Sequence, residues 1–582
     1  MAGRPPIRRR TARGRLVLFL FGLLSVWLGL GYRLFEVQVV RADEYREMGL
    51  NQRLTREVLA PDRGTIFDRD GNPLAMTIDS QTLYAMSDEV EDPTFVAQQV
   101  AAVTGRDWRA LRERLIQGDG FVYLARQVEP EAAAKVLELD LAGVYSLEEP
   151  KRVYPQGAVA AHVVGLVDVD GKGLEGLEYQ YDEILSGTPG EVVFERDRRG
   201  IPIPQGLRHV IPPVPGDDLV TSVNLTIQYA AYQACEEVRE ETDARACWVV
   251  ALHAETGEVL AMAGAPGFDP ERRIAEDGST HLTNFVVRGM YEPGSTQKLI
   301  TLAAALDTGT VGVDTVIPQV SDRIEINPGA CRSPDDDIFG CFGDFSPHET
   351  VDMTVGEIFT RSSNVGTIKI AQRLPAGALV DYMERFGLGH PTGIDYSGEA
   401  PGLLDRPRDP HCNTCVPSAA IGYAVAVTPL QMAAAYAAIA NDGVWTSPSL
   451  VSSRIGIDGK VSSFQPQTRR VVEPETAWVM RQLLAMVVSE GTGQLASIPG
   501  YRVGGKTGTA NKLGDDGKYT DETVASFVGM APIDDPKVVV AVVVDQPAYE
   551  YRTGGRAAAP VFADVMEAAL HALGVVPDAV SS

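Results

Sequence analysis

A serine and a lysine three residues apart give the sequence its first sign of chemistry. Ser295 and Lys298 lie in YEPGSTQKLITLAAAL, directly after a Pro-Gly step and at the start of a helix rich in Leu and Ala. Residues three apart on a helix share one face, so an unprotonated Lys298 amine could take the proton of the Ser295 hydroxyl. The helix N-terminus also favours the negative charge that develops there. The pair meets the minimum requirement for acyl transfer, although an N-cap serine followed by a surface lysine would give the same pattern.

The second pattern is SSN at residues 362–364, in a helical stretch that follows MTVGEIF. The Ser362 hydroxyl can donate and accept a hydrogen bond at once, so it can relay a proton. The Asn364 side chain has both a donor and an acceptor, so it can orient a substrate amide by hydrogen bonds. A polar turn at the end of a helix explains this motif equally well when it is taken alone.

The third pattern is KTGT at residues 506–509, within GYRVGGKTGTANK, and it predicts an edge strand. Lys506 supplies positive charge, and the hydroxyls of Thr507 and Thr509 could bind a substrate carboxylate. Gly508 has no side chain, and we interpret it as the place where a substrate backbone approaches closely. An edge strand can also align an extended peptide by main-chain hydrogen bonds.

The order of the three patterns carries more weight than any one of them. A Ser-x-x-Lys pair combined with Lys-Thr-Gly is typical of penicillin-binding proteins and class A β-lactamases. Ser295, Ser362 and Lys506 occur in the order which that superfamily uses, 67 and 144 residues apart. The combination predicts a serine acyl-enzyme with Ser295 as its nucleophile.

Strands and helices around these motifs must bring them together in one domain. A helical pattern begins at Asn224, and the sequence at 247–266 predicts a β-hairpin around a Thr-Gly turn. Two more strands are predicted near the C-terminus, at 526–532 and 537–547. Strands at both ends that enclose a mostly helical middle predict an α+β fold with an antiparallel sheet. We place this catalytic domain at residues 219–576.

The region from 36 to 215 mixes short strand-like runs, charged helices and turns, and shows no catalytic triad, metal cluster or phosphate loop. We interpret it as a structural or docking domain, here called the pedestal region. IPPVPGDD at 211–218 predicts a hinge, because three prolines within five positions stiffen a linker and exclude a central strand. Residues 577–582 are a short C-terminal tail. A chain of 582 residues is too long for one compact domain, which agrees with this division.

The N-terminus has a basic tail followed by an apolar run. Residues 1–15 include six arginines and no acidic residue, and residues 16–32 have no charged side chain. A membrane-spanning helix needs about 20 mostly apolar residues, and arginines before the span predict a cytoplasmic N-terminus and an exported remainder. We therefore predict a cytoplasmic tail over 1–15 and a transmembrane anchor over 16–35. A cleaved signal peptide is the alternative, but its apolar core is usually shorter, about 7–15 residues.

The net charge and the cysteines indicate which partners and which compartment suit the protein. A formal net charge of −26 argues against nucleic acid as a partner, because binding to phosphates needs a basic face. Cysteines 331/341 and 412/415 lie in loop-like stretches of an exported region, where disulfides within or between these loops would fit. A zinc site of these cysteines with His411 is the weaker alternative. Cys235 and Cys247 lie in a helical pattern and a strand, and we interpret them as core residues.

The chain resembles the class B penicillin-binding proteins, most closely their division-specific FtsI type. The resemblance runs from the anchor to about residue 575 and implies an elongated α/β pedestal domain followed by a penicillin-binding transpeptidase domain with a helical subdomain. The stretches that carry it, besides the three motifs, are RGTIFDRDG at 63–71, GLEGLE at 173–178, FGLG at 386–389, GYAVAVTPLQMA at 422–433 and GYRVGGKTGTANKLGDDGKY at 500–519.

The resemblance implies a peptidoglycan D,D-transpeptidase that cross-links stem peptides ending in D-Ala-D-Ala during septal cell-wall synthesis. Ser295 would attack the penultimate D-Ala carbonyl, with Lys298 as general base. Ser362 and Asn364 would shuttle protons and hold the acyl side. The terminal carboxylate would lie against the KTGT strand, at Lys506, Thr507 and Thr509.

The resemblance also implies that main-chain N–H groups of Ser295 and Thr509 form an oxyanion hole, each donor contributing roughly 3–4 kcal/mol. It implies no metal and no cofactor, and it implies that β-lactams acylate the same serine. The expected membrane partners are a SEDS-family glycosyltransferase and other divisome proteins.

Two alternatives share this chemistry. An elongation-type class B transpeptidase would differ in its partner, whereas a membrane-anchored β-lactamase or β-lactam sensor would lack a large pedestal region. One segment also departs from the expected pattern, because residues 326–347 are longer and more acidic than is usual between the first two motifs. We hypothesise that this segment and CNTC at 412–415 form a disulfide-braced flap near the cleft.

Overall fold

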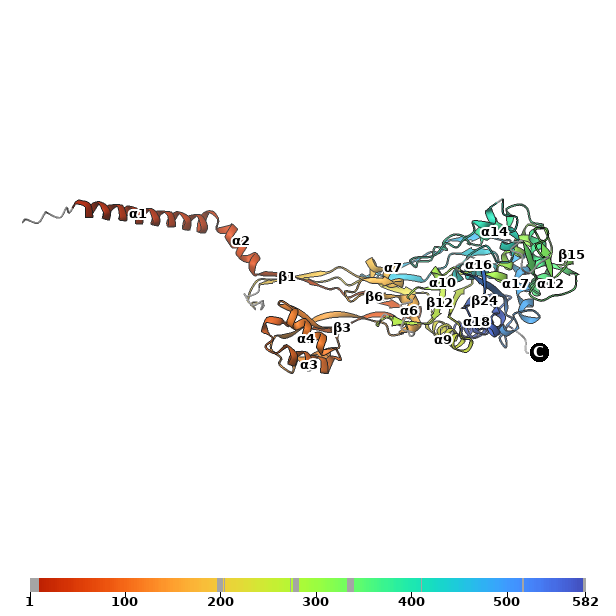
Figure 1. Cartoon of the computed structure of the whole chain (residues 1–582), viewed down its shortest axis with the longest axis horizontal. Coiled ribbons are helices and arrows are strands. Elements are labelled where there is room, and N and C mark those ends of the chain that lie inside the picture. Colours follow the sequence, from red (N-terminus) through yellow and green to blue (C-terminus); the bar gives the residue numbers. More distant parts are fainter. Residues whose placement is uncertain are drawn as a thin grey trace, which may run out of the picture. The chain divides into compact units, whose positions relative to one another are not determined.

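The computed structural model describes residues 10–578, apart from 196–202, 204, 273, 276–281, 332–339, 410 and 515–517. Contacts within the chain divide it into two compact units (Figure 1). The first unit is Met1–Pro61 with Thr188–Val214, and the second is Asp62–Gly187 with Pro215–Ser582. One of the boundaries, between Val214 and Pro215, falls inside the predicted hinge at 211–218.

The first unit contains the predicted anchor. Helix α1 (Arg10–Phe35) continues through a π-helical turn (Glu36–Val40) into helix α2 (Ala42–Arg53). The stretch Arg13–Val40 has a mean hydropathy of 1.8 and is long and apolar enough to cross a membrane. None of it is buried in the protein, so its apolar side chains need a partner such as lipid. A three-stranded antiparallel sheet in the order β1-β8-β9 completes the unit, with β1 at Leu54–Leu59, β8 at Gly190–Glu195 and β9 at Arg208–Ile211.

In the second unit, a seven-stranded sheet joins the pedestal region to the catalytic domain. Strand β10 pairs with β2 of the pedestal region on one side and with β20 of the catalytic domain on the other. The strand order is β21-β20-β10-β2-β3-β4, and β5 pairs with β3. These strands are β2 (Ile66–Phe67), β3 (Pro73–Met86), β4 (Phe121–Val128), β5 (Val144–Val153), β10 (Asp218–Thr221), β20 (Val451–Ile455) and β21 (Val461–Ser463).

Helices of the pedestal region fall into two groups. A small core under β3 and β4 is formed by α3 (Pro93–Thr104), α4 (Trp108–Gln117) and α5 (Pro130–Leu137). Asp92 caps the start of helix α3, where its side chain accepts hydrogen bonds from first-turn N–H groups, and Gly105 caps its end with φ 69°. The remaining elements of the region are α6 (Ala158–Val164), β6 (Leu166–Val167), β7 (Gly173–Glu175), α7 (Gly176–Gln180) and α8 (Asp182–Leu185).

A buried ion cluster links the two stretches that mark the pedestal region in the sequence. Glu178 of GLEGLE is fully buried and accepts hydrogen bonds from Arg63 Nε at 2.5 Å and Arg152 Nε at 2.7 Å. Arg63 also binds Asp182 Oδ1 at 2.7 Å and the carbonyl of Glu178. Each charge therefore has partners of opposite sign, the condition under which buried charges are tolerated.

The catalytic domain is built on a five-stranded antiparallel sheet in the order β12-β11-β25-β24-β23. The predicted hairpin is β11 (Ala246–His253) with β12 (Val259–Ala265), and the predicted C-terminal strands are β24 (Tyr519–Ala531) and β25 (Val538–Asp545). Strand β23 (Gly504–Leu513), which contains KTGT, lies at the edge as predicted. All residues of β12 and nearly all of β11 and β25 are buried, because helices cover both faces of the sheet.

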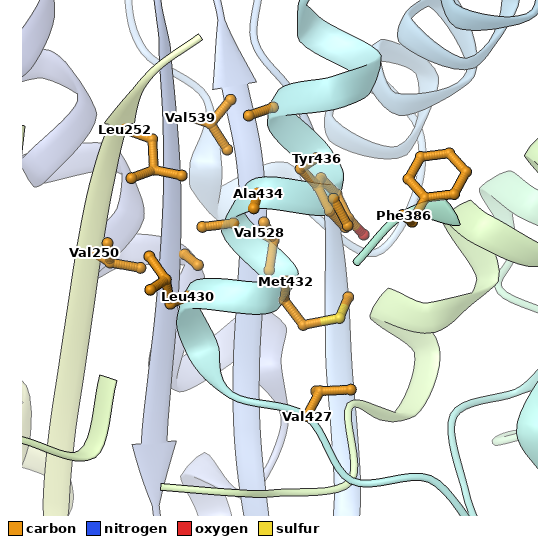
Figure 2. Packing of buried hydrophobic residues seen from close by; sticks show 14 of the residues in the cluster. Val250, Leu252, Phe386, Val427, Leu430, Met432, Ala434, Tyr436, Val528 and Val539 are labelled. Atoms are coloured by element: carbon orange, nitrogen blue, oxygen red, sulfur yellow. The ribbon is translucent and has the colours of Figure 1, made fainter. Parts of the chain in front are cut away.

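One face of the sheet packs on α9 (Leu225–Thr242) and α18 (Gly554–Ala572), and the other on α16 (Pro429–Ala440). Figure 2 shows Leu430 and Ala434 of α16 beside Val250 and Val528 of the strands. Every residue of α16 is buried, and its first turn is closed by a capping box of Thr428 and Gln431. This buried helix supports the segment that carries the first motif, because Tyr436 donates a hydrogen bond to the Thr296 carbonyl at 2.9 Å.

The helical middle predicted between the strands is present. Its helices are α10 (Phe285–Arg288), α11 (Lys298–Asp307), α12 (Val355–Thr360), α13 (Asn364–Ala371), α14 (Ala378–Arg385), α15 (Cys415–Ala420) and α17 (Pro474–Ser489). Its short strands are β13 (Phe268–Asp269), β14 (Ile274–Ala275), β15 (Val316–Val320), β16 (Arg323–Glu325), β17 (Cys341–Gly343), β18 (Val351–Thr354), β19 (Val444–Thr446) and β22 (Thr468–Arg470).

All six cysteines form disulfides, in the pairs Cys235–Cys247, Cys331–Cys341 and Cys412–Cys415. The first pair corrects the interpretation of these residues as core side chains only. Both are fully buried, and they also join α9 to β11. The other two pairs lie within their own loops and take up the thiolates that a zinc site with His411 would have needed.

Candidate active site

The serine and lysine of the first motif lie on two consecutive helical pieces. Ser295 lies in a short 3-10 helix (Gly294–Gln297), and α11 begins at Lys298. The motif was predicted to open an α-helix, and the 3-10 turn makes the alignment closer, because residues i and i+3 of a 3-10 helix eclipse one another. Ser295 is half-buried, whereas Lys298 is fully buried. Within the described part of the chain, the Ser295 hydroxyl has no hydrogen-bond partner.

The second motif is a bend between two helices. Ser362 follows α12 and has φ 58°, a left-handed conformation that is unusual for a residue other than glycine. The bend directs the chain into α13, whose N-cap is Ser363. Backbone strain of this kind clusters at functional sites, where the surrounding structure holds it in place.

Lys298 is held by the second motif. Its Nζ donates to the Ser362 carbonyl at 2.6 Å, to Asn364 Oδ1 at 2.6 Å and to Ser362 Oγ at 3.3 Å. Burial, reinforced by the nearby positive charge of Lys506 and opposed by Asp344, lowers the pKa of Lys298 well below its ordinary value. A neutral amine has a lone pair that can accept a proton, so this lysine is suited to act as a base.

Lys506 approaches the same hydroxyl from strand β23. Its Nζ donates to Ser362 Oγ at 2.9 Å, so the Ser362 hydroxyl bridges the two buried lysines. Burial lowers the pKa of Lys506 to about 7. The structure therefore brings together Lys298 and Lys506 with Ser362 and Asn364, four residues that the sequence motifs had singled out.

The threonines of the third motif face the cavity, and Gly508 between them lies in close contact with its neighbours. A Cβ at Gly508 would lie 2.3 Å from Ser526 Oγ and 2.8 Å from the Pro293 carbonyl. The absence of a side chain thus allows β23 to pack against the turn that carries Ser295, and the predicted approach of a substrate backbone at Gly508 stays a prediction. The Thr507 hydroxyl shares a hydrogen bond of 2.8 Å with Thr492, and Thr509 Oγ1 accepts one of 3.1 Å from the Gly554 N–H.

A cavity of about 920 Å³ collects the motifs. Residues from all three line it, namely Ser295, Ser362, Ser363, Asn364, Thr507 and Thr509. The loop after β17 also contributes, at residues 343–349, so the disulfide-linked segment does border the site. The predicted link between this segment and the CNTC loop is seen as a hydrogen bond from Asn413 Nδ2 to Asn327 Oδ1 at 2.6 Å. Residues 332–339 of the segment lie outside the described residues.

Sequence reasoning missed Asp344, which fixes the second motif. Asp344 Oδ1 accepts from the N–H groups of Asn364 at 2.5 Å and Val365 at 2.9 Å, and Oδ2 accepts from Ser363 Oγ at 2.7 Å. The carboxylate therefore satisfies free N–H groups at the start of α13, where negative charge is favoured. His348 Nε2 contacts Oδ2 at 3.0 Å, and this interaction raises the pKa of His348. The acidic character of 326–347 was the available signal, but it did not single out one residue.

Comparison with known proteins places this geometry in a family. The transpeptidase domain of penicillin-binding proteins matches residues 247–567, and the penicillin-binding protein dimerisation domain matches residues 58–221. Penicillin-binding protein PbpB of Mycolicibacterium smegmatis is 33% identical over 93% of this chain and 88% of its own length. Peptidoglycan D,D-transpeptidase FtsI of Escherichia coli K12 is 31% identical over 99% of this chain and 95% of its own.

The fold has the same relatives. The crystal structure of penicillin-binding protein 3 from Mycobacterium tuberculosis in complex with aztreonam superimposes with a TM-score of 0.69 and 29% sequence identity, covering 90% of this chain and 98% of that one. The chain therefore belongs to the class B penicillin-binding proteins. Its enzyme class is that of the serine-type peptidoglycan D,D-transpeptidases, which penicillins acylate.

Proposed function

We propose that Ser295 is the nucleophile of this transpeptidase and that the two buried lysines control its protons through Ser362. The observation that carries the proposal is the Ser362 hydroxyl, which lies within hydrogen-bond distance of both Lys298 Nζ and Lys506 Nζ beside the Ser295 turn. No other arrangement in the described part of the cavity combines a hydroxyl nucleophile with a base of lowered pKa.

In the first half-reaction, Ser295 Oγ attacks the penultimate D-Ala carbonyl of a stem peptide, and neutral Lys298 takes the hydroxyl proton. Lys298 Nζ is surrounded by three acceptors, whereas a neutral amine has only two N–H groups, so one contact must yield when its lone pair turns to Ser295. The C–N bond to the terminal D-Ala breaks, and the departing amine receives a proton through Ser362. An acyl-enzyme ester on Ser295 results.

In the second half-reaction, the amine of another stem peptide attacks the ester and Ser295 is released. We assign the terminal carboxylate of the donor to Lys506, Thr507 and Thr509, and the oxyanion hole to the main-chain N–H groups of Ser295 and Thr509. Asn364, held by Lys298 through its Oδ1, presents its amide to the acyl side. Gly508 supports this strand by packing, as its crowded Cβ position indicates.

A fluorescent penicillin tests the nucleophile. Incubation with the detergent-solubilised protein, followed by peptide mapping, should place a stable adduct on Ser295. Ser295→Ala should remove the labelling, and labelling that persists in this variant would disprove the assignment. A wild-type adduct that hydrolyses rapidly would favour a β-lactamase.

We further propose that the enzyme works in septal synthesis, anchored by α1 with its basic N-terminus in the cytoplasm. The similarity to FtsI, and the stretch at 500–519 that resembles the division type, support this role, and the six arginines before the span support the orientation. The anchor would contact a SEDS-family glycosyltransferase and other divisome membrane proteins. Photocrosslinkers placed in residues 16–40 test this in cells. Recovery of elongation components alone would overturn the septal role in favour of the elongation-type alternative.

A further inference from the structure

One wall of the catalytic cavity carries two arginines that the proposed reaction does not use. Arg552 and Arg556 line this wall together with Thr553 and Gly555, at the start of α18. Neither guanidinium forms an ion pair with a carboxylate in the residues that the structure describes, in contrast to Arg454 and Arg502. The chain has 78 acidic and 52 basic residues, so a shortage of acids does not explain unpaired arginines inside a cavity.

Local contacts hold both guanidinium groups and leave donors available. The Arg552 guanidinium lies over the ring of Tyr549, 4.1 Å from its centroid. Arg556 Nη1 donates to the Glu550 carbonyl at 2.9 Å, which uses one of its five N–H donors. An arginine whose position is already fixed loses little conformational entropy when it binds a ligand.

The wall adjoins the strand assigned to the terminal carboxylate. The Gly554 N–H at the start of α18 binds Thr509 Oγ1, and Thr523 Oγ1 donates to the Arg552 carbonyl at 3.0 Å. The arginine-bearing segment therefore lies directly beside the strand on which the C-terminus of the donor peptide is proposed to bind.

The other charged groups of the cavity lie on different elements. Arg361, the residue after α12, lines the cavity singly beside the Ser362 bend, whereas Arg552 and Arg556 lie four residues apart on one segment. Asp344 is occupied by the start of α13, and Glu349 and Asp521 also line the cavity. These carboxylates repel an anionic group, which leaves the arginine wall as the favourable place for one.

We propose that Arg552 and Arg556 bind a second carboxylate of the donor stem peptide, separate from its C-terminal carboxylate. The enzyme would then prefer donors with a free acidic group upstream of D-Ala-D-Ala over donors in which that group is amidated. Planar guanidinium groups suit this task because they bind carboxylates with paired N–H···O bonds. The inference rests on the proposed function, since it assumes that the stem peptide occupies this cavity.

Three penicillins that share one nucleus test the inference. Carbenicillin carries a side-chain carboxylate where benzylpenicillin has a hydrogen and ampicillin an ammonium group, while all three share the ring carboxylate. Second-order acylation rate constants of the full-length protein would be measured for each by stopped-flow competition with a fluorescent penicillin. The carbenicillin-to-ampicillin ratio should fall about tenfold in Arg552→Gln/Arg556→Gln, in line with the loss of charge-assisted hydrogen bonds. Using a ratio cancels any general loss of acylation.

Two further variants separate recognition from folding. Arg109 in the pedestal region also stacks on an aromatic ring, that of Trp108, so Arg109→Gln is a matched control and should leave the ratio unchanged. Arg552→Lys/Arg556→Lys keeps the charge without the planar fork, and should retain part of the preference for carbenicillin.

The outcomes are distinguishable. An unchanged ratio in the double Gln variant would overturn the inference. So would an equal loss for benzylpenicillin and carbenicillin, because the arginines would then serve the shared ring carboxylate. Absence of any Ser295 adduct in the wild-type protein would instead overturn the proposed function on which the inference rests.

Discussion

Two clusters of buried charged side chains lie in the second unit, one around Glu178 in the pedestal region and one around Ser362 in the catalytic domain. In the first, Arg63 and Arg152 share the carboxylate of Glu178. In the second, two lysines share a hydroxyl, and neither forms an ion pair with a carboxylate among the described residues. Glu178, Lys298 and Lys506 are all fully buried, so the clusters differ in pairing and not in depth.

The pairing decides what burial does to each group. Opposite charges at Glu178 and Asp182 outweigh burial and raise the pKa of Arg63, so the cluster remains charged and holds the structure together. Burial without a counter-ion lowers the pKa of Lys298 and brings that of Lys506 to about 7, so these amines can exchange protons. The desolvation of buried charges therefore has two outcomes in this chain. Paired charges stabilise the pedestal region, and unpaired lysines in the catalytic domain become able to exchange protons.

The largest effect is expected from removal of the proposed base. Lys298→Met should slow acylation of Ser295 by about 10²- to 10⁴-fold, the contribution typical of a general base. The measurement is the second-order rate constant for benzylpenicillin. Lys369→Met is a matched control on α13, because among the described residues Lys369 binds only the backbone carbonyls of Pro318 and Gln319. Near wild-type acylation by Lys298→Met would show that this cluster is not the source of catalysis.

Glu178→Gln should reduce the stability of the fold, whereas Lys298→Met should reduce the rate of acylation. It replaces the shared carboxylate by a neutral amide, so that Arg63 keeps only Asp182 and Arg152 loses its carboxylate partner, and the expected loss is about 3–5 kcal/mol in the free energy of unfolding. Urea unfolding of the detergent-solubilised protein measures the change. Exposed Glu183 lies five residues further on and provides the control Glu183→Gln, for which we expect a change within about 0.5 kcal/mol. Equal stabilities of the two variants would mean that the ion cluster is not structural.

Lys506→Met should stabilise the protein while it impairs the enzyme. The folded-state pKa of Lys506, about 7, lies below the value of about 10.4 expected in the unfolded chain. Between these values the unfolded state binds more protons, so the contribution of Lys506 makes wild-type stability rise with pH. The variant lacks this penalty, and its advantage in melting temperature should be greatest below pH 7 and vanish towards pH 10.

The same variant affects the neighbouring amine. Loss of the Lys506 charge removes one cause of the lowered pKa of Lys298, so residual acylation should shift to higher pH. Melting curves from pH 6 to 10 and the pH profile of acylation test both parts. A melting-temperature difference that does not change with pH would contradict the burial of a titrating lysine.

The sequence was sufficient to nominate residues that the structure places around one cavity, because their types and order are local information. Short motifs nominated Ser295, Lys298, Ser362 and Lys506, and the third motif also predicted the edge strand. The α+β arrangement was predicted from the order of strand and helix patterns. The 3-10 turn at Ser295 and the left-handed Ser362 could not be predicted, because packing around the bend, and not the preference of serine, imposes them.

Contacts between residues far apart in the sequence could not be predicted. Asp344 lies 20 residues before Asn364, and Glu178 lies 115 residues after Arg63. Such contacts depend on how elements pack, and each residue alone looks like an ordinary surface acid in the sequence. The Cys235–Cys247 bridge was missed for the same reason, since a helix and a strand had to be placed side by side before the pairing became visible.

The smallest effect is expected where the active-site cluster meets the disulfide-linked segment. The Cys331–Cys341 bridge joins the loop between β16 and β17 to the first residue of β17, and Asp344 follows β17 directly. Cys331→Ser/Cys341→Ser should loosen the hairpin but leave the hydrogen bonds of Asp344 to α13 available. We expect acylation to slow about threefold, equivalent to about 0.7 kcal/mol.

Asp344→Asn, which weakens those hydrogen bonds directly, should slow acylation more, and Cys412→Ser/Cys415→Ser should slow it less. A disulfide variant slower than Asp344→Asn would mean that the hairpin acts on the site by a route other than this carboxylate.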